Sequence, residues 1–279
     1  MLAARGVAFE AKDFAMGVRI EHPQELIDRR QYGQRVDTRV LGAAEYFLSC
    51  KSEEGPGAHS FCMCPGGEVL PTTTDASELA TNGMSFRARA GRWANSGLVV
   101  PIRRQELVAW AASNGIPDDI WTGIRLQQRL ERDAFAMGGG GFRAPAQRAA
   151  DYLDGQVGRN LPQSSYARGL ASVDLATLLP DFMAQEIANA LFDFDRKIPG
   201  FIRHGLMIAP ETRTSSPLRV PRNPETLAVP GIEGLYALGE GAGWSGGIVT
   251  SAADGLRLAD RAASRKRALP DSDLATATP

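Results

Sequence analysis

The residue types with the clearest chemical potential lie in a glycine-rich segment near the end of the chain. An apolar run ends there in an acid, Glu240, and an apolar helix is predicted to follow. Glycines remove side chains from the backbone, so a large ligand can approach it closely. The first turn of a helix adds unpaired N–H groups and a partial positive charge. The segment therefore predicts a dinucleotide cofactor site formed by Gly239, Glu240, Gly241, Gly243, Ser245, Gly246, Gly247 and Ile248. A tight strand-to-helix turn without a ligand is the alternative.

Two cysteines form a second candidate, in Phe61-Cys62-Met63-Cys64-Pro65-Gly66-Gly67. On an extended strand, Cys62 and Cys64 point to the same face. This favours small packing residues that line the interior or the wall of an active site. A zinc site needs four ligands, and only Cys50 and three scattered histidines remain, so we expect no metal. A redox dithiol stays open, although the spacing differs from Cys-x-x-Cys.

Three further groups of polar residues could contact a ligand. Arg213 lies among four hydroxyl residues and could bind an anionic or carbonyl group, unless the segment is a polar edge strand. The Asn82 amide, beside an Asn-Gly turn, could also reach a ligand, and Ser85 lies in the same segment. Glu21 and His22 could form an acid–base pair, although neighbours in sequence often point apart.

The elements that must position these residues begin with strands and continue with helices. The turn Pro65-Gly66-Gly67 predicts a hairpin. Helical spacing predicts one helix that ends at Asn114-Gly115, one that opens at Pro117, one that opens at Pro180, and a last one over 248–261. Strands are predicted at 6–10, 14–21, 44–49, 59–63, 68–72, 97–101 and 235–238.

Composition excludes several classes of protein. The net charge of −1 gives no electrostatic footprint for nucleic acid. No apolar run is long enough to cross a membrane, and the N-terminus lacks the apolar core of a signal peptide. Three cysteines in 279 residues argue against a disulfide framework. We therefore expect a cytoplasmic protein that binds neither nucleic acid nor membrane.

Five segments in order resemble one known family. The chain is similar to the C-terminal part of the uncharacterised FAD-dependent dehydrogenases, also called NAD(FAD)-utilising dehydrogenases, from about residue 6 to about residue 262. The segments are Gly17-Val18-Arg19-Ile20-Glu21-His22-Pro23-Gln24, Phe61 to Gly67 as above, Thr81-Asn82-Gly83-Met84-Ser85, Glu211-Thr212-Arg213-Thr214-Ser215-Ser216-Pro217, and Gly239-Glu240-Gly241-Ala242-Gly243.

The resemblance implies an α/β flavoprotein of the two-dinucleotide-binding type, here an incomplete α+β fragment. Members carry an N-terminal Rossmann half with the glycine-rich loop for FAD. That half is missing, so we expect this chain to be part of a longer protein. The expected domains are a substrate or cap domain over 1–230, the last segment of the FAD domain over 231–262, and a disordered tail over 263–279.

The implied activity is hydride transfer through flavin N5 on an unknown organic substrate, with NAD(P)H as a candidate donor. Glu240 would hold the ribityl or pyrophosphate region of FAD. The substrate-side candidates are Cys62, Cys64, Asn82, Ser85 and Arg213. The expected partners are a small-molecule substrate and the missing Rossmann half. The alternative is a non-catalytic product, either truncated or a split chain that completes a flavoprotein fold with a partner.

Overall fold

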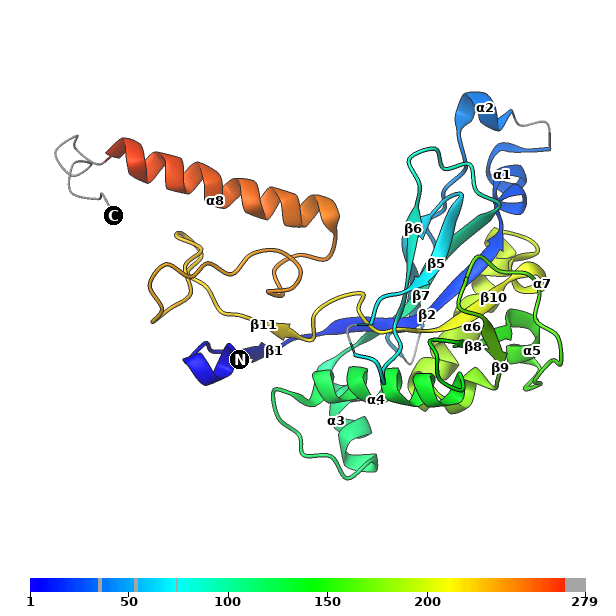
Figure 1. Cartoon of the computed structure of the whole chain (residues 1–279), viewed down its shortest axis with the longest axis horizontal. Helices are drawn as coiled ribbons and strands as arrows, with labels where there is room; N and C mark the ends of the chain where they lie inside the picture. The colour runs from blue at the N-terminus through cyan, green and yellow to red at the C-terminus, as the bar shows by residue number, and fades with distance from the viewer. Residues whose placement is uncertain (35–36, 53–54, 74, 269–279) are drawn as a thin grey trace. The chain divides into compact units, whose positions relative to one another are not determined.

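The computed structural model describes residues 1–34, 37–52, 55–73 and 75–268 (Figure 1). The chain divides into two compact units, one of Asp13–Thr214 and one that combines Met1–Lys12 with the chain from Ser215 onward. The division lies at residues 12/13 and 214/215, whereas the boundary predicted from the sequence lies at residue 230. Each unit is described by itself.

A seven-stranded mixed sheet forms the centre of the Asp13–Thr214 unit. All neighbouring strands are antiparallel except β8 and β9, which are parallel. This mixed α/β architecture confirms the predicted fold class. The strand order is β3 (Ser49–Cys50), β4 (Ala58–Cys64), β7 (Trp93–Ile102), β2 (Phe14–Pro23), β10 (Leu206–Glu211), β8 (Ala144–Arg148) and β9 (Leu170–Ser172).

The central strand β2 is buried on both faces. Met16, Val18 and Ile20 point to one face, in the main apolar core with residues of the helices. The opposite face carries Arg19 and Glu21, which are also buried. A separate two-stranded ribbon, β5 (Gly67–Pro71) with β6 (Thr81–Ser85), contacts β2 and β7 on this polar side. A charged side chain is therefore enclosed between a sheet and a ribbon.

The predicted helices are largely confirmed. The α3 helix ends at Ser113, directly before Asn114-Gly115, and α6 begins directly after Pro180. The helix predicted from Pro117 begins only at Thr122, because the Asp119 carboxylate accepts the Trp121 N–H and holds a turn there. The helices of this unit are α1 (Gln24–Tyr32), α2 (Thr38–Leu41), α3 (Arg104–Ser113), α4 (Thr122–Met137), α5 (Ala149–Leu153), the short η2 (Leu175–Thr177), α6 (Asp181–Lys197) and α7 (Phe201–His204).

The strand predictions are correct for 14–21, 59–63, 68–72 and 97–101 but wrong elsewhere. Only Ser49 of the predicted strand 44–49 lies in a strand, and only Glu10 of 6–10. The turn at Pro65-Gly66 forms, but no hairpin does. Instead, β4 pairs with β3 and β7, whereas β5 pairs with β6. The turn thus leads the chain out of the main sheet into the ribbon that covers it.

The second unit contains the short pair β1 (Glu10–Ala11) with β11 (Leu218–Arg219), the 3-10 turn η1 (Ala3–Arg5) and the long helix α8 (Ile248–Ala268). The strand predicted at 235–238 is wrong. Tyr236 forms a single bridge with Ala228, because the chain turns back through the left-handed glycines Gly231 and Gly234. Residues 263–268 continue α8 and are not a disordered tail. Residues 269–279 of that predicted tail lie outside the described residues.

Gly17 shows how closely the central strands approach one another. A Cβ atom at this position would overlap the carbonyl oxygen of Leu98 on β7. We expect Gly17→Ala to lower the free energy of unfolding by about 2–3 kcal/mol, because backbone atoms cannot move aside. Urea denaturation measures this. Gly255→Ala in α8, where a Cβ meets no atom, is the control that is expected to cause no loss. Equal stabilities of the two variants would contradict the prediction.

Candidate functional site

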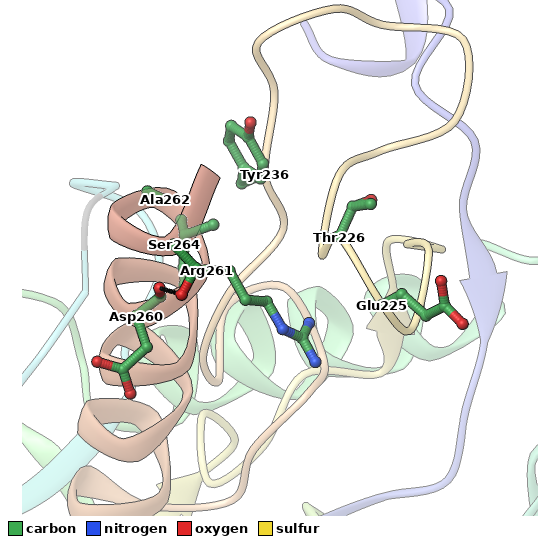
Figure 2. A pocket seen from close by; sticks show the side chains of 8 residues that line it. Glu225, Thr226, Tyr236, Asp260, Arg261, Ala262 and Ser264 are labelled. Atoms are coloured by element: carbon green, nitrogen blue, oxygen red, sulfur yellow. Dashed lines mark hydrogen bonds between the residues drawn. The ribbon is translucent and has the colours of Figure 1, made fainter. Parts of the chain in front are cut away.

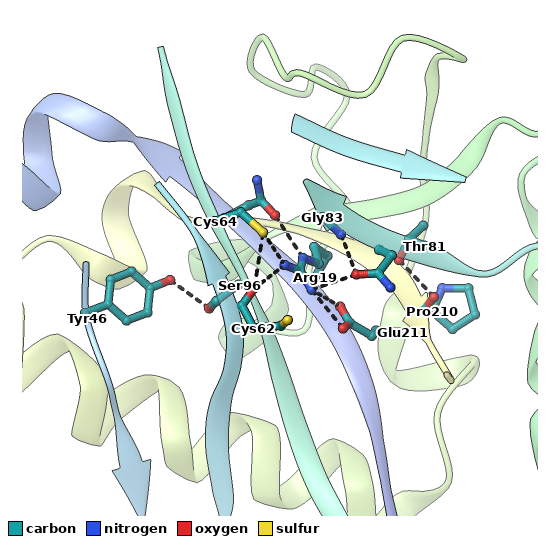
Figure 3. Close-up of polar contacts among 11 residues, drawn as sticks. Arg19, Tyr46, Cys62, Cys64, Thr81, Gly83, Ser96, Pro210 and Glu211 are labelled. Atoms are coloured by element: carbon teal, nitrogen blue, oxygen red, sulfur yellow. Dashed lines mark hydrogen bonds and ion pairs between the residues drawn. The ribbon is translucent and has the colours of Figure 1, made fainter. Parts of the chain in front are cut away.

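An arginine without solvent exposure, Arg19, lies at the centre of the polar side of the sheet (Figure 3). Its Nη1 donates to both carboxylate oxygens of Glu211 at 2.8 Å. Its Nε donates to Asn95 Oδ1 at 2.9 Å, and Asn82 Oδ1 lies 3.5 Å from Nη1. The remaining nitrogen, Nη2, donates to the Cys62 carbonyl oxygen at 2.6 Å and to Cys64 Sγ at 3.3 Å. Strand β2, which carries Arg19, and four other strands, β4, β6, β7 and β10, therefore meet at one guanidinium.

Two bulges aim these partners at Arg19. On β4 the register shifts between Phe61 and Cys64, so Cys64 faces Asn95 where Met63 would lie in a regular ladder. On β10 it shifts before Glu211, which then faces Gly17. A shift by one residue moves a side chain to the other face of a sheet. Both bulges therefore bring a polar side chain to the buried face.

Two glycines make room for the charged groups. A Cβ at Gly83 of the β5–β6 ribbon would overlap the Arg19 guanidinium and the Asn95 amide. A Cβ at Gly97 would lie 3.1 Å from a carboxylate oxygen of Glu211. The ribbon can cover the ion pair only because these side chains are absent.

The electrostatics of the cluster follow from its burial. Desolvation lowers the pKa of Arg19, but attraction to Glu211 and the hydrogen bonds that Arg19 donates to this carboxylate outweigh it, so the net shift of the pKa is upward. Burial raises the pKa of Glu211 against the attraction of Arg19. The guanidinium stays charged, and its N–H groups all point at protein atoms. It ties strands together and has no donor left for an external anion.

The structure places the substrate-side candidates in different surroundings. Cys62, Cys64 and Asn82 meet at Arg19. Ser85 instead donates to the Pro65 carbonyl oxygen at 2.9 Å and closes the turn before β5. Arg213 pairs with the buried carboxylate of Glu131 at 2.8 Å, which neutralises its charge.

The expectation that Cys62 and Cys64 share a face is wrong. Cys64 is buried, and burial raises the pKa of its thiol. Cys62 is exposed and adopts a left-handed backbone with φ of 48°. The bulge breaks the alternation on which the expectation depended.

Glu21 and His22 do not form an acid–base pair, because they point to opposite faces of β2. The Glu21 carboxylate accepts the Ser165 N–H at 3.1 Å and the Ser165 hydroxyl, and burial raises its pKa. The His22 ring lies 4.1 Å from the Phe201 ring and its Nε2 bonds the Phe201 carbonyl oxygen at 2.8 Å. Both side chains support the fold.

Three residues that organise this face, Arg19, Asn95 and Glu211, are not among the site residues predicted from the sequence. One signal was present, since Arg19 interrupts the otherwise apolar run Phe14-Ala-Met-Gly-Val-Arg-Ile20. A charge in such a run needs a buried partner. Nothing in the sequence selects Glu211 among the chain's 32 acidic residues.

The glycine-rich segment precedes α8 in the other unit. Gly239 and Gly243 adopt left-handed conformations with φ of 71° and 80°. A Cβ at Gly241 or Gly246 would meet no atom within 4 Å, so the backbone there is open. Ile248, the first residue of α8, is 83% exposed. Open backbone thus leads directly into an exposed helix N-terminus.

Buried polar contacts hold this segment to α8. The Asp254 carboxylate accepts the Gly239 N–H at 3.0 Å and forms two hydrogen bonds with Arg222. Hydrogen bonds from Arg222 lower the pKa of Asp254. The Ser245 and Ser251 hydroxyls lie 2.6 Å apart. Glu240 is half-buried, and burial raises its pKa.

A cavity of about 260 Å³ lies farther along the same helix (Figure 2). Tyr236, Thr226 and Arg261 line it, and Arg261 donates to the Pro224 carbonyl oxygen at 3.1 Å. None of the glycines at 239–247 contributes to it. This cavity is therefore distinct from the predicted cofactor segment.

Two features are absent from the described part of the chain. Within it, no three His, Cys, Asp or Glu side chains gather closely enough to bind a metal ion. No helix there combines the length and the apolar character needed to span a bilayer.

Comparison with known proteins identifies the family of this chain. A model of the family described as FAD-dependent protein, C-terminal domain-like, matches residues 13–214. The chain belongs to this family. An uncharacterized protein of Clostridium beijerinckii is 39% identical over 264 residues, which are 93% of this chain and 48% of that protein. The chain thus spans about half the length of that relative.

The match to the FAD-dependent family coincides with one structural unit. Residues 13–214 contain the Arg19 cluster and both of its bulges, whereas the glycine-rich segment at 239–248 lies outside the matched residues. The family therefore accounts for the seven-stranded sheet, and the cofactor residues named from the sequence stay a prediction.

The buried side chain of His22 is expected to make the stability of the protein depend on pH. Burial lowers the pKa of His22 from 6.5 to about 4. Between these pH values the unfolded state holds more protons, so stability falls as the pH drops. The loss at pH 4 is on the order of 3 kcal/mol. Urea denaturation near pH 7 and near pH 4 measures it. His22→Gln, although less stable near pH 7, should lack this component, and an unchanged pH dependence would refute the assignment.

Removal of one partner of the buried ion pair is expected to be costly. Glu211→Gln leaves the Arg19 charge without a carboxylate and should lower the free energy of unfolding by about 3–5 kcal/mol. Glu45→Gln, at an exposed pair with Arg89, is the control, with a loss below about 1 kcal/mol. The double variant Arg19→Met/Glu211→Leu removes both charges and should be more stable than Glu211→Gln. The reverse order in denaturation midpoints would count against an electrostatic cause.

Proposed function

We propose that this chain is the C-terminal part of a flavin-dependent oxidoreductase. The match of residues 13–214 to a family of FAD-dependent proteins carries the proposal. FAD, when bound, would supply hydride transfer through its N5 atom to or from an organic substrate. A Rossmann half in the remainder of a longer protein would hold the adenosine side of FAD. The C. beijerinckii relative, about twice as long as the matched region, supports such a remainder.

The segment at 239–248 fits the role of cofactor contact. The open backbone at Gly241 and Gly246 leaves space for a ligand beside the chain. The first turn of the 21-residue helix α8 presents N–H groups and a partial positive charge to that space. This positive end would stabilise negative charge on a bound flavin. Glu240 would accept hydrogen bonds from ribityl hydroxyls.

Exposed apolar residues on α8 support the proposal that a further domain covers this helix. Val249 is 81% exposed and Leu256 67% exposed, and exposure of such side chains to water is unfavourable. A Rossmann half, either in the same longer protein or in a separate chain, would cover them. The second case is the split-chain alternative.

On the substrate side, we propose that Cys62 and Asn82 face the reacting centre while Arg19 positions them. The exposed Cys62 thiol lies on a bulge whose carbonyl oxygen accepts from Arg19. The Asn82 amide is oriented by Arg19 and by the Gly83 N–H, which donates to Asn82 Oδ1 at 2.7 Å. Bulges often re-aim side chains beside active sites.

Flavin retention tests the proposal. The 279-residue chain alone is expected to purify without flavin, and the longer protein, or the chain co-expressed with a Rossmann partner, with its yellow absorbance. In the longer protein, Glu240→Ala should reduce FAD content more than Cys62→Ser, because only Glu240 would contact the ribityl or pyrophosphate region. FAD content is measured by absorbance after release from the protein.

Three outcomes distinguish a failure of the proposed function from a failure of the proposed cofactor segment. Flavin in the longer protein that falls in Glu240→Ala supports both the function and the cofactor segment. Equal flavin content in Glu240→Ala and in the parent contradicts the cofactor segment alone. A longer protein that never retains or binds added FAD contradicts the function.

A further inference from the structure

A basic, solvent-open cavity lies in the Asp13–Thr214 unit, and no residue of the Arg19 cluster lines it. Its volume is about 460 Å³, and it lies between the start of β8, strand β9 and the loop over 159–166. Its lining includes Arg143, Arg159, Asn160, Ser164, Tyr166 and Leu170. A cavity of this volume suits a small organic molecule.

The two arginines that line this cavity form no ion pair within the described part of the chain. Among the described residues, neither Arg143 nor Arg159 has a carboxylate partner. The surrounding sequence, 142–172, holds four arginines and two aspartates. Most of the other arginines in this unit whose side chains donate hydrogen bonds donate to a carboxylate, as Arg125 does to Asp119. Unneutralised guanidinium groups are the preferred protein ligands of phosphate and carboxylate.

Backbone contacts hold Arg143 and the loop that carries Arg159. Arg143 Nη2 donates to the Leu170 carbonyl oxygen at 3.0 Å, which orients its guanidinium along β9. Arg148 donates to the Asn160 carbonyl oxygen through Nε at 3.2 Å and Nη2 at 3.0 Å. The second contact fixes the loop that carries Arg159. The basic wall is thus attached to the sheet, which reduces the cost of ordering it around a ligand.

Part of the cavity lining is apolar, which indicates a second property of the ligand. Leu170 and the buried Tyr166 supply apolar surface beside the arginines, and the Tyr166 hydroxyl is already used on the Phe142 carbonyl oxygen at 2.7 Å. Asn160 adds an amide at the rim. A ligand with one anionic group and a short apolar body matches this arrangement.

We propose that this cavity binds a small organic anion through Arg159 and Arg143, with a phosphate or carboxylate against the two guanidinium groups. The site lies within the matched domain and does not depend on FAD or on the flavin function proposed above. Binding would be charge-dependent and selective for the anionic group.

Isothermal titration of the 279-residue chain with inorganic phosphate, at constant ionic strength set by sodium chloride, tests the site. We expect saturable binding that weakens about tenfold or more in Arg159→Gln, because one charge-assisted contact is lost. Arg87→Gln is the matched control, since Arg87 is also exposed but does not line this cavity. Arg143→Gln, with its thermal midpoint checked against the parent, should weaken binding similarly.

A parallel titration with succinate distinguishes the two anionic groups. Binding of phosphate alone, or of succinate alone, that is lost in Arg159→Gln supports the site and identifies the group. The absence of saturable binding for both anions overturns the proposal. Equal losses in Arg87→Gln and Arg159→Gln also overturn it, since they indicate a general effect of surface charge.

Discussion

A guanidinium that has no access to water must find all of its partners inside the protein, and Arg19 imposes this requirement on the sheet. Its ion pair with Glu211 places a charge between the main sheet and the β5–β6 ribbon. Desolvation of such a pair is costly unless further hydrogen bonds complete it. Asn95, Asn82 and the Cys62 carbonyl oxygen complete it here. Bulges and glycines at several positions follow from this one enclosed charge.

The same constraint explains why the polar side of the sheet is specific in register. An apolar face tolerates the exchange of one aliphatic side chain for another of similar volume, because such contacts are not directional. A slip of one residue on β4 or β10 would instead turn Cys64 or Glu211 away from Arg19 and leave its N–H groups unpaired. The strands beside β2 are thus fixed by hydrogen bonds as well as by packing.

The other unit has a different balance. Its apolar cluster is small, centred on Val7, Val220, Val229 and Ala237. The Asp254–Arg222 pair and the Gly239 N–H hold α8 to the glycine-rich loop, while Val249 and Leu256 stay exposed. Polar contacts therefore set the local geometry of the loop, and the apolar face of the helix is available to a neighbour. Under the function proposed above, another part of a longer protein would complete the contacts of this segment.

The sequence by itself determined the local elements: period and turn chemistry located α3, α6, α8 and the longer strands, and the ordered motifs indicated a FAD-dependent family. It could not determine which strands pair, because the turn at Pro65-Gly66 is equally compatible with a hairpin and with a change of sheet. It also could not place Cys62 and Cys64 on different faces, since a bulge is invisible to a period of two. The partner of Arg19 was decided only by tertiary structure. Glu211 lies 192 residues away, and the burial that forces the pairing exists only once the sheet and ribbon have closed over it.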